Sequence, residues 1–249
     1  PATIDMEIKY AQTMVTKAFD NDKIDGRALK PFRRTKRKLK KGSNARKRAI
    51  GVDEYLKLLP NAAAHLQPIL IVMFNTGMRT GEIRKLRWSH IDRKAMFIRL
   101  PKEITKEKRP KNIPINHHVK NVLDSIPRHL KHNFVFTYKG GTITQKDGLK
   151  RSFRTACKNA KIPCGQKTPN GITPHDFRRT MKTNMLSAGV DKAHRDMIVG
   201  HSLHGMDAIY LVENDEALRA AMDKFTKWID KQLITADINQ TINQKQISK

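Results

Sequence analysis

The stretch NTGMRTGEIRKLRW, residues 75–88, decides how the chain folds. An apolar run, Leu66–Phe74, precedes it and predicts a buried helix. The Asn-Thr-Gly sequence at the start of the stretch breaks that helix. A second helix is predicted from about Thr80, with Ile83 and Leu86 facing inward. Arg79 therefore lies in the break between two packed helices.

On both sides of this stretch the pattern is mostly helical. Ala95–Leu100 predicts a strand and Asn112–Ile115 its partner, with a basic tip, Lys102–Lys111, between them. Further helices are predicted from apolar residues at helical spacing, in Ile4–Phe19, Val52–Pro60, Val119–Ile126, Leu149–Ala160, His175–Leu186 and Leu218–Ile229.

The composition indicates a polyanionic partner. Fifty Lys and Arg against 23 Asp and Glu leave a net charge of +27 on 249 residues, and nucleic acid is the commonest partner of such a field. No apolar run approaches the ~20 residues of a membrane-spanning helix. Two cysteines, Cys157 and Cys164, predict neither a disulfide framework nor a zinc site, and so favour a reducing compartment.

Four segments are expected along the chain. Residues 1–30 are expected to be the last helix of an otherwise missing N-terminal domain. Residues 31–48 hold ten Lys and Arg and no acid, which predicts a basic linker that repels its own charges. Residues 49–233 form the main domain, and residues 234–249 form a polar C-terminal tail.

Six residues far apart in the sequence form a set suited to attack on a phosphodiester. They are Arg79, Lys106, His175, Arg178, His201 and Tyr210. Planar guanidinium forks suit the charge that grows on the non-bridging oxygens. A tyrosine hydroxyl, with a pKa of ~10, becomes a usable nucleophile when cations favour its ionised form. A lysine in a hairpin can supply the proton that the leaving alkoxide needs.

Each of these residues also has a simpler interpretation. Any one of fifty Lys and Arg is most often a solvated charge. A lone His is most often a surface residue or a satisfied core residue, and a lone Tyr most often packs in a core. His129 and His132 have the spacing of a metal-binding pair, but no acid or cysteine cluster accompanies them, so no metal site is expected there. The joint order and spacing of the six favours the chemical interpretation.

This order resembles the tyrosine recombinase, or phage integrase, family. TGMRTGEIRKLRW resembles its first arginine box, with Glu82 as the acidic companion of Arg79. HDFRRT resembles its His-x-x-Arg box, GHS its histidine box, and Tyr210 stands at the usual distance from His201. The family's hairpin lysine lies eight residues before a strand proline, here Pro114, which implies Lys106; Lys108 and Lys111 are close alternatives.

The resemblance implies a mainly α-helical domain with a small antiparallel β-sheet, an α+β catalytic fold. It implies that Tyr210 attacks the scissile phosphate and forms a 3′-phosphotyrosyl link, that Arg79 and Arg178 stabilise the transition state, and that Lys106 protonates the leaving 5′-oxygen. His175 would assist proton transfer at Tyr210, and His201 would hydrogen-bond the phosphate. No metal, ATP or other cofactor is required by this chemistry.

The implied partners are double-stranded DNA and further copies of the chain, which would form a tetramer when assembled on a recombination site. The implied location is cytoplasmic and nucleoid-associated, in a prokaryote or encoded by a phage. No membrane partner is implied. Two other functions stay open: a type IB topoisomerase-like DNA-relaxing enzyme and a noncatalytic DNA-binding regulator. The cations expected to contact DNA are Arg33, Arg34, Lys36, Arg37, Lys38, Lys40, Lys41, Arg46, Lys47, Arg48, Lys108, Arg109 and Arg179.

The basic segment 31–48 generates a testable prediction. If it follows a phosphate backbone, replacing several of its Lys and Arg by Gln should reduce the slope of log affinity against log salt by ~0.9 for each phosphate that is no longer neutralised. The measurement is DNA binding by the full chain across a salt series. An unchanged slope would show that the segment is only a solvated tether.

Overall fold

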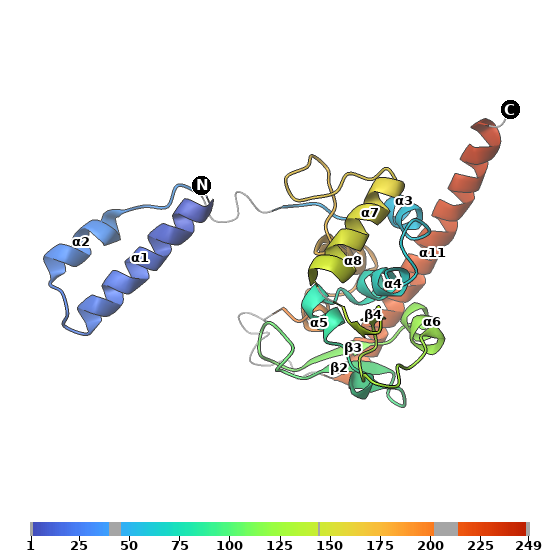
Figure 1. Cartoon of the computed structure of the whole chain (residues 1–249), viewed down its shortest axis with the longest axis horizontal. Coiled ribbons are helices and arrows are strands. Elements are labelled where there is room, and N and C mark those ends of the chain that lie inside the picture. The colour runs from blue at the N-terminus through green and yellow to red at the C-terminus, as the bar shows by residue number, and fades with distance from the viewer. Residues whose placement is uncertain (1, 40–45, 144, 202–213, 248–249) are drawn as a thin grey trace. The chain divides into compact units, whose positions relative to one another are not determined.

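The computed structural model describes residues 2–39, 46–143, 145–201 and 214–247. It divides the chain into two compact units, Pro1–Lys47 and Arg48–Lys249 (Figure 1). No helix among the described residues has the length and apolar character needed to cross a bilayer.

The first unit is a pair of helices, where the sequence predicted one. α1 (Ala2–Asp20) packs on α2 (Gly26–Arg34), whose N-cap Asp25 accepts a hydrogen bond from Ala28 N at 2.9 Å. Gln12 Nε2 donates to the carbonyls of Phe32 (2.9 Å) and Thr35 (2.8 Å) and so joins the two helices. Residues 31–34, which the charge pattern placed in the linker, are therefore the last turn of α2.

The second unit is mostly helical. α4 (Gln67–Thr76) contacts α6 (His117–Ser125) and α8 (Asp176–Ser187), and α8 also contacts α9 (Lys192–Val199). The long α11 (Asp215–Ile247) runs along one side of this unit, against α3, α8 and α9 (Figure 1). The other helices are α3 (Val52–Leu58), α5 (Thr80–Arg84), η1 (Trp88–His90), the π-helical η2 (Gln145–Arg151) and α7 (Ser152–Asn159).

Aromatic side chains join the helices at the centre of this unit. Tyr55 of α3 stacks on Phe74 of α4, with ring centroids 3.9 Å apart. Phe177 of α8 meets Phe74 edge to face at 6.3 Å and Phe153 of α7 at 6.1 Å. Such pairs contribute about 0.5–1.5 kcal/mol each beyond the burial of their area. The chain around Arg79 and that around Arg178 are thereby fixed to one core.

The sheet is small and antiparallel, as predicted. Its order is β1 (Ile91–Asp92), β2 (Phe97–Leu100) and β3 (Lys111–Pro114), and Leu100 pairs with Lys111 at the loop end of the β2–β3 hairpin. Residues 101–110 form the irregular loop that joins β2 to β3. A second hairpin pairs β4 (Thr137–Tyr138) with β5 (Gly141–Thr142).

Further differences from the sequence-based expectation lie in α9 and α11. α9 was not predicted, because KAHRDMIV carries a short apolar stripe among polar residues. The expected tail 234–249 does not begin at a break, since α11 continues through it to Ile247. Ile234 and Ile238 on this continuation remain exposed.

Candidate active site

Arg178 is the centre of the candidate site. It lies on α8 and is 3% exposed. Its Nη1 donates to the carbonyl of Gly77 at 3.0 Å, and its Nη2 donates to the carbonyl of Gly200 at 3.3 Å. Burial, and then the nearby charge of Arg79, lower the pKa of Arg178 to about 10, so the side chain stays cationic at neutral pH. A buried cation needs such acceptors, because an unpaired one is very costly.

Both acceptors are glycines that end a helix. Gly77 caps α4 and Gly200 caps α9, each in the left-handed backbone region, at φ +62° and +68°. The C-terminal end of a helix carries partial negative charge, which favours a cation there. A Cβ at Gly200 would lie 2.8 Å from Lys111 Cδ, and one at Gly77 would lie 3.2 Å from Met181. Any other residue would be strained at both positions by the positive φ, and its Cβ would make a tight contact.

Arg79 lies two residues after Gly77 and directly before α5. Its Nη1 donates to Glu82 Oε1 at 2.9 Å, and its backbone N–H donates to Glu82 Oε2 at 3.0 Å. The guanidinium also holds Glu107 of the β2–β3 loop in a two-pronged ion pair, with Nη1 to Oε2 at 2.7 Å and Nη2 to Oε1. A carboxylate thus occupies the fork that sequence analysis assigned to phosphate.

Lys111 is the buried lysine of the site. Its side chain is 3% exposed, and its Nζ donates to the equally buried Glu82 at 3.0 Å. Burial lowers the pKa of Lys111 to about 8, against the opposing effect of Glu82. Burial also raises the pKa of Glu82, but Lys111 and Arg79 outweigh it and hold that pKa below its ordinary value. Lys106, the lysine selected by sequence, is instead exposed in the 101–110 loop.

The two histidines line one hollow with Arg178. A cavity of about 440 Å³ is bounded by His175, Arg178, Arg179, Lys182, Thr183, Leu186, Arg195 and His201. His201 Nδ1 lies 3.1 Å from Lys182 Nζ and 3.3 Å from Asp196 Oδ1. Burial, followed by Arg178 and Lys182, lowers the pKa of His201 to about 4, so its ring is neutral at pH 7. Burial and the arginines also lower the pKa of His175.

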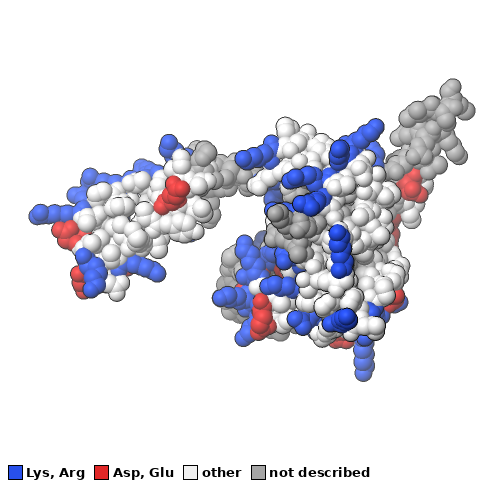
Figure 2. Space-filling view, viewed as in Figure 1, with Lys and Arg blue, Asp and Glu red and all other residues white. Residues whose placement is uncertain are grey.

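Among the other predicted residues, some are not described and some are held in ion pairs. Tyr210, Lys40 and Lys41 fall outside the described residues. Arg48 is paired with Glu54 and the Asn170 carbonyl, and Arg179 pairs with Asp176. On the face drawn in Figure 2, Lys and Arg outnumber Asp and Glu on both units. The remaining predicted cations that are exposed are Arg33, Arg34, Lys36, Arg37, Lys38, Lys47, Lys108 and Arg109, while Arg46 is half-buried.

The comparisons with known proteins agree with this architecture. A sequence model described as the phage integrase family matches residues 48–217. The shufflon-specific DNA recombinase of Escherichia coli is 27% identical over 171 residues, which are 66% of this chain and 40% of that protein. The chain spans 40–62% of the length of four curated relatives that it matches.

Two solved structures share the fold. The Tn1549 transposon integrase in complex with a circular intermediate DNA has a TM-score of 0.63 at 19% identity, over 90% of this chain and 79% of that one. A lambda integrase tetramer bound to a Holliday junction has a TM-score of 0.62 at 17% identity, over 81% of this chain and 59% of that one.

The buried pair of Lys111 and Glu82 generates a prediction about stability. Lys111→Met should lower the free energy of unfolding by about 3 kcal/mol, the lower end of the cost of breaking a buried ion pair, because Glu82 keeps Arg79 as a partner. Urea denaturation followed by circular dichroism measures it. The control, Lys102→Met in the exposed part of the adjoining 101–110 loop, should change stability by less than about 0.5 kcal/mol. Equal effects of the two variants would contradict the buried pair.

The stability lost in Lys111→Met should depend on pH, because Lys111 has a lowered pKa in the folded chain. The pKa of Lys111 is about 8 in the folded chain against an ordinary value of 10.5, so between these pH values the unfolded chain holds a proton that the folded chain has released. Stability from this group therefore rises with pH in that window. The stability difference between wild type and Lys111→Met should widen from pH 8 to pH 10, and a constant difference would argue against the lowered pKa.

Proposed function

The chain belongs to the phage integrase family, and from this premise we propose that it is a site-specific DNA recombinase that cleaves and rejoins DNA through a 3′-phosphotyrosyl intermediate. One observation carries the proposal. Arg178 is buried between two helix ends, beside the turn that holds Arg79, and shares a cavity with His175 and His201. A rigid set of cations around a hollow suits a phosphodiester whose charge grows during the reaction.

The two arginines have distinct positions in this proposal. Arg178 is fixed from behind by two carbonyls, which leaves little freedom to reorient when a phosphate enters. Arg79 is fixed by Glu82 on one side, while its fork is held by Glu107. Guanidinium donors held in place beforehand need no reorganisation in the transition state. The scissile phosphate takes the place of the Glu107 carboxylate on Arg79.

In this proposal His201 donates a hydrogen bond and His175 assists proton transfer. His201, with a pKa of about 4, is an uncharged ring at the cavity and can hydrogen-bond a non-bridging oxygen. His175 borders the same cavity and assists proton transfer at Tyr210, which attacks phosphorus and displaces the 5′-oxygen. The phosphotyrosyl bond conserves the energy of the broken phosphodiester, so resealing by a 5′-hydroxyl needs no ATP, and no step requires a metal.

The proposed partners are a duplex recombination site and further copies of the chain. The net charge of +27 supplies attraction to phosphate along the whole chain. The related lambda integrase forms a tetramer on a Holliday junction. A tetramer is proposed here as well, because strand exchange between two duplexes requires four cleavages.

The nucleophile gives the decisive experiment. Tyr210→Phe should keep DNA affinity but abolish the covalent protein–DNA adduct, because only the hydroxyl is removed. The assay is incubation of the full chain with a candidate attachment-site library, a denaturing gel, and sequencing of the trapped DNA. Tyr138→Phe, on β4, is the matched control and should retain the adduct. Wild-type adduct levels from Tyr210→Phe would refute the assignment, and adducts formed without sequence preference would favour a DNA-relaxing enzyme.

The general acid gives a second prediction. Replacing the bridging 5′-oxygen by sulfur creates a leaving thiolate with a pKa of ~8.5, which departs with little protonation. Lys106→Ala should cleave ordinary DNA slowly and the sulfur-substituted DNA at nearly the wild-type rate. Arg79→Ala should not be rescued, because its charge acts on the non-bridging oxygens. If Lys111→Ala is rescued and Lys106→Ala is not, the buried lysine is the donor and the assignment from spacing is wrong.

The ion pair between Arg79 and Glu107 gives a third prediction. Removing the Glu107 charge should favour phosphate on Arg79, so Glu107→Gln should bind DNA about fivefold more tightly, as expected for removal of a competing pair worth about 1 kcal/mol. Glu103→Gln, exposed in the same loop and equal in charge change, is the control. Fluorescence anisotropy at fixed salt measures both. Equal gains would mean that Glu107 acts only through net charge.

A further inference from the structure

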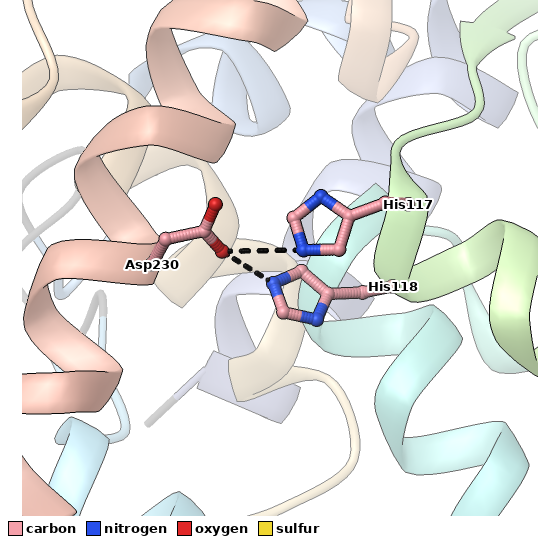
Figure 3. A group of neighbouring side chains, drawn as sticks. All are labelled: His117, His118 and Asp230. Carbon is pink, nitrogen blue, oxygen red and sulfur yellow. Dashed lines mark hydrogen bonds and ion pairs between the residues drawn. The ribbon is translucent and has the colours of Figure 1, made fainter.

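Three side chains at the junction of α6 and α11 lie close together, outside the candidate active site. His117 and His118 begin α6, and Asp230 lies on α11, 112 residues after His118. Both imidazole Nε2 atoms point to the same carboxylate oxygen, Asp230 Oδ1, at 3.4 Å and 2.7 Å (Figure 3). Within the part of the chain that the structure describes, this is the one such group of His, Cys, Asp or Glu donors, all within 4.8 Å of one another.

We propose that His117, His118 and Asp230 form a binding site for one divalent transition-metal ion, of which Zn²⁺ is the best fit. Two imidazole nitrogens and one carboxylate oxygen are donors that zinc takes together, with water completing a tetrahedron. The ion would join α6 to α11.

The spacing of the donors fits this coordination. With zinc bonds of about 2.0–2.1 Å, tetrahedral donors lie about 3.3 Å apart. The separation of His117 Nε2 and Asp230 Oδ1, 3.4 Å, already has that value. The hydrogen bond from His118, at 2.7 Å, must widen by about 0.6 Å. A small side-chain rotation of His118 at the start of its helix is sufficient for that.

The surroundings also suit a metal ion. The side chain of His117 is 51% exposed and that of Asp230 is 36% exposed, which leaves access for the ion and for water. The ring centroids of His117 and His118 lie 4.0 Å apart, and both Nε2 atoms face the Asp230 carboxylate.

A second histidine pair in the chain lacks this arrangement. His129 and His132 stack with ring centroids 4.9 Å apart, and the carboxylate-containing group of donors does not include them. His132 Nε2 lies instead 3.0 Å from the carbonyl of Gly140. This pair resembles the proposed site in residue type and ring proximity but not in its donor set, which makes it the matched control.

The experiment is zinc binding to the full chain after treatment with a chelator, measured by isothermal titration calorimetry at pH 7.5 without DNA. Wild type should bind one equivalent of Zn²⁺. His118→Ala and Asp230→Asn should each bind it at least tenfold more weakly, since even groups that only orient a ligand are worth that much. The double variant His129→Ala/His132→Ala should bind as wild type does. Co²⁺ in place of Zn²⁺ should give the visible absorption of a tetrahedral site in wild type and not in Asp230→Asn.

Three outcomes would overturn the proposal: no binding by wild type, equal binding by wild type and Asp230→Asn, or absence of binding in the His129/His132 variant alone. Thermal unfolding without metal shows whether each variant is folded. If His118→Ala does not fold, His117→Ala, at the more exposed of the two histidines, provides a second test. Because the assay contains no DNA, its result is independent of the proposed recombinase activity.

Discussion

The guanidinium of Arg178, buried between the carbonyls of Gly77 and Gly200, is the constraint on which the site depends. It requires α4 and α9 to end at the same place, in left-handed turns that only glycine adopts without strain. Removal of either carbonyl would leave a buried charge short of a partner. The aromatic contacts among α3, α4, α7 and α8 hold these ends in place, so the candidate site is positioned by the core.

Acids are few in this chain, and three of them organise the site. Glu82 bridges Arg79 and Lys111, Glu107 occupies the fork of Arg79, and Asp196 pairs with Lys182 beside His201. Without them, neighbouring cations would repel one another in a poorly solvated space. The cluster is therefore assembled before any polyanion arrives. That agrees with catalysis by groups held in place beforehand.

Much of the fold followed from the sequence, because apolar stripes specify α4, α8 and α11 and two short apolar runs on either side of a basic segment specify the β2–β3 pair. The short α9 was not predicted, because its stripe of apolar residues is weak. In the site, the order and spacing of the sequence boxes led to Arg79, Arg178, His175 and His201. The burial of Lys111 could not be predicted, since a lysine beside a basic loop usually stays in water. The contact of Asp230 with His118 joins residues with no local pattern, and Tyr210 lies outside the described residues.

The Glu107 carboxylate on Arg79 sets a threshold for what can enter the site. A tethered group competes at an effective concentration that reaches the millimolar range for short flexible connections. A free phosphate ion, or a DNA segment that contacts only this site, must compete with the Glu107 carboxylate for the Arg79 guanidinium. A duplex seated along many cations presents its own phosphate at a comparably high local concentration and displaces the glutamate. Under the proposed function, the loop thus couples occupation of the active site to extended docking of DNA.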